Sequence, residues 1–599
     1  MTAPILSSGI CIVSLSAAAA AQWTALPPDP CAWPYADSIS EPANSQQIFV
    51  SRSFSVFANG KFYVLGGRSG FDYEEGLTVW PNSNRHSHLS VFDPVSGTWE
   101  GGGVQSQLAY TGEVVRLDAG SFLVQGDVTG DLVVGDQVRV ESGDGIVPGE
   151  VKSFVGRIGS LTFDGAATTV TLSRGVVPPT WSPRAGDKVF VVTVMGPAPI
   201  NNGNGGDVAR AGEGYQAGNH TMVAAYDRDA DGLKEIYLFS GYPHWTPNNV
   251  DVYNPATKSW SRATGNLPGS VNEQRAAGAQ VGDLFCWMGR DEGGQVQVYD
   301  LVTDTWTLDL VPGLALDFLC TGQGFPELGP KGAVYYFGGD ASSKKTVRYD
   351  VLQGTFAALA PPPVTANQSA SVRYGDYVIL FGGRSGGGAS TAVDAVQVYD
   401  TVSNTWFVSP YRLPFRGSGI AAGISPDGIV YIAGGLDHNV MWRNDAYAIP
   451  AASLLTSGVS GTLDLEFHLD PSAVPASVQV FAPGGTEPVA TATLELDATG
   501  GFVSPLGVSP GVYDLRFLAQ NFLAKRLNGV TLSRGDNAVG TVALRNGDGS
   551  GNNQVDLADL NIVLINFAKS GTGDYDGDGH VGLADLNIVL VNFSKQGDD

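Results

Sequence analysis

Carboxylates at alternate positions mark a cation-binding stretch close to the end of the chain. Asp574, Asp576 and Asp578 are separated by single residues, Gly579 follows, and Asp585 stands at the twelfth position counted from Asp574. A curled loop of this kind points every second side chain inward, where the oxygens surround a Ca²⁺ ion, and the glycine permits the sharp turn. The spacing therefore predicts calcium as the cofactor of this loop.

An earlier copy of the loop carries fewer charges. Its ligand positions are filled by Asp548, Ser550, Asn552, Asp556 and Asp559. Asn553 stands in the place of the glycine, and asparagine tolerates the left-handed backbone conformation better than most residues do. We therefore expect this loop to form and to bind Ca²⁺ with a lower affinity than the later copy.

A third stretch with the same spacing lies far from the tail. Its acidic residues are Asp227, Asp229, Asp231 and Glu235. Apolar runs at 221–226 and 236–239 flank it, so we expect it at the tip of a β-hairpin. Either Ca²⁺ braces this turn, or the stretch is a polar hairpin that binds no metal.

Each tail loop leads into a predicted helix, and the two copies are nearly identical. Residues 555–567 repeat as residues 581–593. Apolar residues recur at helical spacing, and these are Leu560, Val563, Leu564 and Phe567 in one copy and Leu586, Val589, Leu590 and Phe593 in the other. The pattern predicts two short helices, each with one apolar stripe.

Paired loops of this kind, with Asp at position twelve and no entering helix, resemble a type I dockerin over residues 546–599. The resemblance implies paired calcium loops and a cohesin-like protein partner. The partner-reading positions hold Leu557-Ala558 and Leu583-Ala584, whereas cellulosomal dockerins often carry polar residues there. The alternative is a calcium-stabilised terminal cap that has no partner.

A repeated phrase occupies much of the chain upstream. An aromatic residue is followed by Asp or Asn and, seven positions after the first, by a second aromatic residue; the phrases begin at Phe92, Tyr253, Tyr299, Tyr349 and Tyr399. Each follows an apolar run that ends in small residues. The later copies recur about every 50 residues, and a repeat of this length with about four short strands predicts one blade of a β-propeller.

The repeat resembles the kelch family over residues 22–110 and 200–455. The resemblance implies a mainly β protein with a six-bladed kelch β-propeller of the galactose-oxidase-like type, although the copper ligands of galactose oxidase cannot be assembled here. The sixth copy lacks its last strand. We expect residues 22–28 to supply that strand beside residues 445–449 and so to close the ring.

Two further β domains are expected. Residues 111–199 interrupt the repeat and alternate between apolar and polar side chains, which predicts an inserted β domain. Residues 456–545 also alternate, and the phrase from Ser509 to Phe517 resembles carboxypeptidase-regulatory-like and Cna-B-like β-sandwiches, which are usually spacers. With the small α-helical tail, these domains complete a mainly β architecture.

Composition limits the partners and the location. Residues 1–21 are apolar and small, and the alanines before Gln22 fit a signal-peptide cleavage site, so we expect a secreted, extracellular or cell-surface protein. The formal charge of −25 argues against a nucleic-acid partner. No later segment reaches the ~20 consecutive apolar residues of a membrane helix, so no membrane span is predicted.

Arginines suggest one enzymatic hypothesis. Arg52, Arg275 and Arg416 each precede the first strand of a predicted blade, where kelch blades line the central channel. A similar channel mouth in bacterial N-acetylneuraminate epimerase, a secreted kelch protein, acts on an acidic sugar. A carbohydrate-active enzyme, an epimerase or lyase of acidic sugars, is therefore one alternative. In the other, these arginines pair with blade carboxylates.

The leading hypothesis is a secreted, non-catalytic binding protein. The sequence contains six structural repeats and three cation loops, but no nucleophile motif, phosphate loop or HExxH helix. On this hypothesis the propeller is a platform for a protein or a glycan, the sandwich is a spacer, and the tail is a calcium-dependent docking module. The dockerin resemblance implies a polysaccharide-related context.

Overall fold

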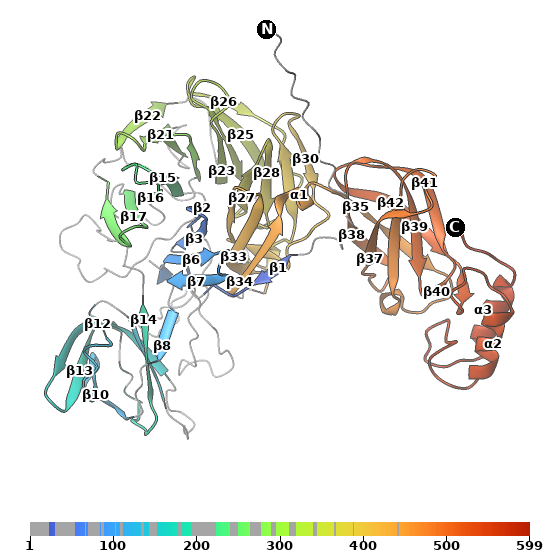
Figure 1. The fold of residues 1–599 in the computed structure, drawn as a ribbon, viewed down its shortest axis with the longest axis horizontal. Coiled ribbons are helices and arrows are strands. Elements are labelled where there is room, and N and C mark those ends of the chain that lie inside the picture. The colour runs from blue at the N-terminus through green and yellow to red at the C-terminus, as the bar shows by residue number, and fades with distance from the viewer. Residues whose placement is uncertain are drawn as a thin grey trace, which may run out of the picture. The chain divides into compact units, whose positions relative to one another are not determined.

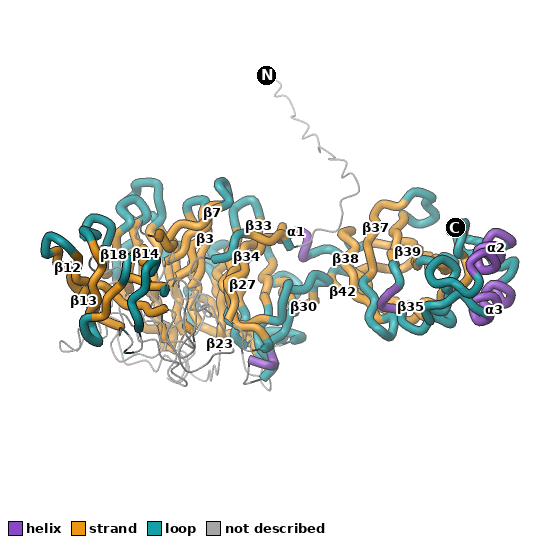
Figure 2. Tube along the Cα trace, turned by 90° about the horizontal axis from the view of Figure 1, so that it is seen from below, coloured by secondary structure: helices purple, strands orange, loops and turns teal. Residues whose placement is uncertain are grey.

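Strands make up most of the structure, as Figure 2 shows in orange. The computed structural model describes residues 23–29, 54–65, 68–69, 84–85, 89–101, 104–107, 112–132, 134, 137–142, 153–175, 177, 179, 181–193, 223–239, 250–263, 277–288, 295–310, 319–338, 344–364, 367–386, 389–439 and 442–599. They form two compact units, one within residues 23–406 and 412–451 and the other comprising 407–411 and 452–599. The predicted signal peptide lies outside the described residues.

Five antiparallel sheets of four strands recur along the first unit, each in up-and-down order (Figure 1). The first two contain β2 (Phe54–Ala58), β3 (Lys61–Leu65), β6 (Leu89–Asp93) and β7 (Thr98–Gly101), then β15 (Val223–Tyr226), β16 (Glu235–Phe239), β17 (Val250–Asn254) and β18 (Ser259–Arg262). The next contains β19 (Ala277–Val281), β20 (Leu284–Met288), β21 (Gln295–Asp300) and β22 (Thr305–Leu310). The last two contain β23 (Leu319–Phe325), β24 (Ala333–Gly338), β25 (Lys345–Asp350) and β26 (Thr355–Ala358), then β27 (Ala370–Tyr374), β28 (Tyr377–Phe381), β29 (Val396–Asp400) and β30 (Thr405–Val408).

The repeated sequence phrase is the hairpin between the third and fourth strands of each sheet. In one copy Tyr299 lies opposite Trp306, with ring centroids 4.9 Å apart. Asp300 Oδ1 accepts hydrogen bonds from the backbone N–H groups of Val302 and Thr303, each at 2.9 Å. The aromatic pair therefore covers the hairpin while the acidic side chain closes its turn.

The sixth sheet uses both ends of the first unit. It contains β1 (Thr24–Leu26), β31 (Gly417–Ser418), β32 (Ala421–Ile424), β33 (Ile429–Asp437) and β34 (Trp442–Pro450). Thr24 lies opposite Ala448 and Leu26 opposite Ala446 in an antiparallel pair. The predicted pairing of the N-terminal strand with the last strand of the repeat is confirmed.

One strand of each sheet, namely the first strand of each four-stranded sheet and β32 of the sixth sheet, contacts its counterpart in the next sheet; these six are called the first strands below. β2 touches β15, and the contacts continue through β19, β23, β27 and β32, which again touches β2. Side-chain hydrogen bonds join these strands at Gln280 with Ala225, at Thr321 with Ser371 and at Ser55 with Ala422. Polar side chains thus satisfy backbone groups where two sheets meet.

The insertion is one seven-stranded antiparallel sheet. Its order is β8 (Val104–Gln107), β14 (Lys188–Thr193), β11 (Gln137–Glu141), β12 (Ser153–Phe163), β13 (Ala167–Gly175), β10 (Ser121–Gln125) and β9 (Val114–Arg116). β8, which lies before the predicted start of the insertion at residue 111, pairs with β14 and so belongs to the same sheet. Buried Asp187 accepts a hydrogen bond from Val114 N at 3.0 Å, which ties the loop before β14 to β9.

The second unit contains two packed sheets, which follow the short helix α1 (Ala451–Leu454) in the chain. One contains β38 (Gly501–Val508), β35 (Ser457–Leu465) and β42 (Gly535–Leu544), and the other β37 (Pro488–Leu494), β36 (Ala476–Phe481), β39 (Gly511–Ala519) and β41 (Lys525–Leu532). Buried apolar residues from both sheets, including Leu463, Val478 and Phe517, form one core. Tyr513, within the phrase from Ser509 to Phe517, donates a hydrogen bond to Ser509 O at 3.0 Å.

The tail of this unit consists of two loop–helix segments. α2 (Leu557–Asn566) and α3 (Leu583–Asn592) follow the two predicted cation loops, and β43 (Asn546–Asp548) leads into the first loop and pairs with β40 (Asn521–Phe522) (Figure 1). The predicted apolar stripe is divided. Val563 and Val589 are buried in a small core, whereas Leu564 and Leu590 are exposed. Burying one face and exposing the neighbouring one follows from the two helices packing on each other and on the loops.

Candidate metal sites

The later tail loop brings three carboxylates together. One oxygen each of Asp574, Asp576 and Asp578 lies within 4.8 Å of the others. Asp574 Oδ2 accepts a hydrogen bond from Gly579 N at 2.9 Å, and Gly579 has the left-handed φ of 92° that the predicted turn requires. The donor set consists of hard oxygens on a curled loop, which fits Ca²⁺.

Asp585 closes this loop from the start of α3. It is buried, and it lies outside the three-carboxylate cluster. Its Oδ1 accepts from Tyr575 N at 2.6 Å, and its Oδ2 accepts from Gly582 N at 2.7 Å. One carboxylate therefore holds the beginning of the loop against the helix, next to the three clustered ligands.

The earlier loop has the same framework with fewer charges. Asp548 Oδ2 accepts from Asn553 N at 2.8 Å, and buried Asp559 accepts from Ser550 N and Asp556 N, each at 2.8 Å. Asn553 has a φ of 63°, as the sequence predicts for the residue in the glycine position. Ser550 and Asn552 stand where the later loop has carboxylates, so less negative charge faces the centre of this loop.

Burial and crowding of charge shift two of these carboxyls. Burial raises the pKa of Asp548, and the charge of Asp559 raises it further. Burial likewise raises the pKa of Asp576, with Asp585, Asp578 and Asp574 adding to it. A bound cation would remove this repulsion, so both loops are electrostatically suited to a divalent ion.

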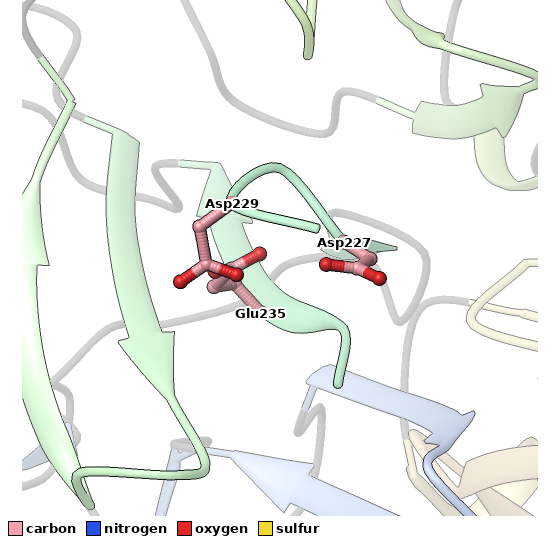
Figure 3. Close-up of side chains that lie close together, drawn as sticks. All are labelled: Asp227, Asp229 and Glu235. Carbon is pink, nitrogen blue, oxygen red and sulfur yellow. The ribbon is translucent and has the colours of Figure 1, made fainter. Parts of the chain in front are cut away.

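The hairpin between β15 and β16 forms the third cluster, drawn in Figure 3. Oxygens of Asp227, Asp229 and Glu235 lie within 4.8 Å of one another. Asp231, which the sequence predicts as a ligand, is outside this cluster and exposed, and its Oδ1 accepts from Leu233 N at 2.7 Å. Glu235 is 6% exposed, and burial raises its pKa. The hairpin position is as predicted, with one ligand fewer.

The first strands of the six sheets surround a cavity of about 210 Å³, to which every one of them contributes residues. Of the arginines predicted here, Arg52 and Arg275 lie outside the described residues. Arg416 is absent from the described lining of the cavity; its side chain is 63% exposed, and its Nε lies 4.0 Å from Asp394 Oδ2. A carboxylate neighbour is the alternative considered for these arginines, and a ligand-binding role of Arg416 stays a prediction.

Arg373 of β27 is the charged residue in the described lining, and the sequence argument missed it. Its guanidinium forms an ion pair with Glu327, donates to Gly324 O at 3.1 Å and lies 4.1 Å from the ring centroid of Phe325. These contacts all belong to the neighbouring sheet. Arg373 therefore joins two sheets, which is the pairing role considered for the other arginines.

Apolar side chains are exposed at equivalent places on the two tail helices. Leu564 and Leu590 are each 53% exposed, and Ile565 and Val591 are 70% and 65% exposed. Leu557 and Leu583, at the predicted partner-reading positions, are also exposed. The two copies of the sequence repeat therefore expose the same kind of side chain at equivalent positions, in addition to forming the same local fold.

Comparisons with known proteins give partial likenesses. No protein-family model matches the chain. Kelch-like protein 35 of Mus musculus is 26% identical over 190 residues, which is 31% of this chain and 31% of that protein. The chain therefore matches less than a third of the length of this curated relative.

Two solved structures are similar to part of the chain. They are an N-terminal and a C-terminal interface mutant of a type II cohesin–X–dockerin complex from Acetivibrio cellulolyticus, 22% and 23% identical. Each match covers 24% of this chain and 97% of the other chain, with a TM-score of 0.20. No helix among the described residues is long and apolar enough to span a membrane.

Proposed function

We propose that this protein is a secreted, non-catalytic interaction protein whose tail is a calcium-dependent, dockerin-like docking module. One observation carries the proposal, the repeated exposure of large apolar side chains beside two cation loops. Eight such residues are exposed on or next to α2 and α3: Leu557, Leu564, Ile565, Phe567, Leu583, Leu590, Val591 and Phe593. So many exposed large apolar side chains on so small a tail are typical of a protein-binding site.

The exposed residues indicate the kind of partner. Residues at the predicted reading positions are apolar, so a cohesin-like partner should present an apolar face, unlike the partners of dockerins with polar reading positions. Calcium supports this surface because each loop leads directly into a helix whose first turn holds a loop carboxylate, Asp559 or Asp585. Losing the ion would loosen the start of the helix that carries the exposed residues.

Binding of the full chain to immobilised, purified type I and type II cohesins tests the proposal. We expect binding in millimolar Ca²⁺ and none in EGTA. The double variant Leu564→Asp with Leu590→Asp should abolish binding, because it charges both copies of the surface. Val402→Asp is the matched control, since Val402 is an exposed apolar residue on the first unit. Absence of binding to every cohesin in calcium would refute the docking role, and so would binding that survives the double substitution.

For the first unit we propose a closed six-bladed kelch β-propeller that serves as a binding platform. The serial contacts among the six first strands and the pairing of β1 with β34 support closure. The partial likeness to a kelch-like protein supports the repeat assignment and an interaction role. In a polysaccharide-related context, the ligand we propose for this platform is a protein or a glycan. Turnover of an acidic sugar by the full chain would overturn this choice in favour of an epimerase or lyase.

The described channel lining favours the platform over the enzyme. Arg373 is already engaged by Glu327 and by backbone oxygen, and the lining residues described include no Asp, Glu or His. An epimerase or lyase needs an acid or base that faces the group holding the sugar carboxylate.

A further inference from the structure

One buried tyrosine lies between the two calcium loops. Tyr575 is the second residue of the later loop, and it is 1% exposed. Its ring belongs to the small core of the tail, together with Val555, Val563 and Val589. Its hydroxyl has no hydrogen-bond partner among the described residues. A buried hydroxyl without a partner is costly, by about 1–3 kcal/mol, so its position calls for an explanation.

The hydroxyl lies against the earlier loop. Gly549 is the second residue of that loop, and a Cβ atom added to it would stand 1.9 Å from Tyr575 Oη and 2.7 Å from Cζ. The backbone of Gly549 is not in the left-handed region, so the tyrosine and not the backbone conformation requires glycine here. The second positions of the two loops, Tyr in one and Gly in the other, are therefore complementary in shape.

Two ligand positions of the earlier loop flank the contact with the hydroxyl. Gly549, whose backbone the hydroxyl approaches, stands between Asp548 and Ser550 in the chain. A side chain that begins in the later loop therefore ends against the backbone that carries the first two ligand positions of the earlier loop.

The backbone of Tyr575 is held by the later loop. Asp574 and Asp576, two of the clustered carboxylates, flank it in the chain. Its N–H donates to Asp585 Oδ1 at 2.6 Å, and its carbonyl accepts from Asn546 Nδ2 at 2.7 Å. An ion that fixes the carboxylates on both sides of Tyr575 also fixes the direction in which its side chain leaves the loop.

We propose that Tyr575 is a positioning residue for the earlier loop, through which Ca²⁺ bound in the later loop raises the affinity of the earlier one. This inference rests on the proposed calcium binding, and it adds the order in which the two loops bind their ions. The later, more charged loop fills first and orders Tyr575. Its hydroxyl then fixes the backbone at Gly549, between Asp548 and Ser550, in the loop that has Ser550 and Asn552 in place of acidic ligands. Couplings between sites are typically 5- to 150-fold, and we expect about fivefold or more here.

A double-mutant cycle on the full chain tests the coupling. All variants carry Asp229→Asn, which removes the hairpin cluster from the titration. Calcium binding is followed by calorimetry in four proteins: this background, Tyr575→Phe, Asp578→Asn, and both changes together. The signal of the earlier loop is the one that Asn552→Ala weakens. Tyr513→Phe is the matched control, because Tyr513 lies in the same unit and its hydroxyl bonds to Ser509 O.

Asp578→Asn should weaken calcium binding at the earlier loop about fivefold or more, although Asp578 belongs to the later loop. Tyr575→Phe should weaken the earlier loop similarly, and the two changes together should cost little more than either alone. If Tyr575 only packs in the core, Asp578→Asn will change the calcium affinity of the earlier loop by the same factor whether residue 575 keeps its hydroxyl or carries the Tyr575→Phe change. That result would overturn the inference. If neither loop of the background protein binds calcium, the proposed calcium-dependent function fails instead.

Discussion

Asn553 offers a sharp test, because local and tertiary considerations predict opposite effects of replacing it with glycine. Its left-handed φ of 63° is one that glycine adopts without penalty, so local reasoning favours Asn553→Gly by up to about 1 kcal/mol. The structure shows two contacts that glycine would lose. Asn553 Oδ1 accepts from Ala524 N at 2.8 Å, and Asn553 Nδ2 donates to Asp598 O at 3.1 Å.

The magnitude follows from these contacts. The bond to Asp598 O contributes about 1 kcal/mol, and leaving the N–H of Ala524, a residue 6% exposed, without its acceptor costs about 1–3 kcal/mol. Subtracting the backbone gain, we expect Asn553→Gly to destabilise the second unit by about 2 kcal/mol. For a unit of roughly 150 residues this lowers the melting temperature by about 4–8 °C.

Differential scanning calorimetry of the full chain, with and without Ca²⁺, measures the effect. The transition of the second unit is recognised by its calcium dependence. Asn521→Gly is the matched control, since Asn521 has a φ of 70° in the same unit and no side-chain hydrogen bond is found for it among the described residues. Asn521→Gly should leave the melting temperature unchanged or raise it, because it keeps the backbone gain and loses no hydrogen bond. The reasoning is refuted if Asn553→Gly behaves in the same way.

Three further results are expected. Removing calcium with EGTA should lower the melting temperature of the second unit and leave that of the first unit in place. A calorimetric scan that EGTA does not change would contradict the proposed binding of calcium by the tail loops. Burial raises the pKa of Glu235, so the folded hairpin binds the carboxyl proton more tightly than the unfolded chain does. The stability of the metal-free first unit should therefore fall as the pH rises from the pKa of Glu235 in the unfolded chain through its raised pKa in the folded protein. Urea unfolding at a series of pH values measures this decline, and Glu235→Gln should remove it. Arg373→Ala should destabilise the first unit by about 1–3 kcal/mol in the same assay, because Glu327 and Gly324 O lose their partner, and a neutral effect would argue that the contact between those sheets is unimportant.

Local spacing was enough to predict the elements whose contacts are short in sequence. The later loop is such an element, because its carboxylates, the glycine at its turn and the helix after it lie within one stretch of chain. The spacing of these residues is therefore enough to predict the geometry of the loop. The aromatic-Asp phrase is equally local, because it is one hairpin with a turn closed by its own acidic side chain. The pairing of β1 with β34 was also predictable, since a repeat that ends one strand short leaves an edge that only the other terminus can complete.

Contacts between distant segments were decided by the tertiary structure alone. Sequence spacing does not give the exposure of Asp231 or of Arg416, both of which are exposed in the fold. It also does not show that Arg373 lines the cavity between the six sheets. Tyr575 and Gly549 stand at equivalent positions of the two loops, and only the packing of the loops shows that the tyrosine side chain occupies the space left by the glycine. These cases have one physical reason. The spacing of residues determines which side chains share a loop or a strand face. How deeply a side chain is buried, and which residue it contacts, depends on segments that are distant in the sequence.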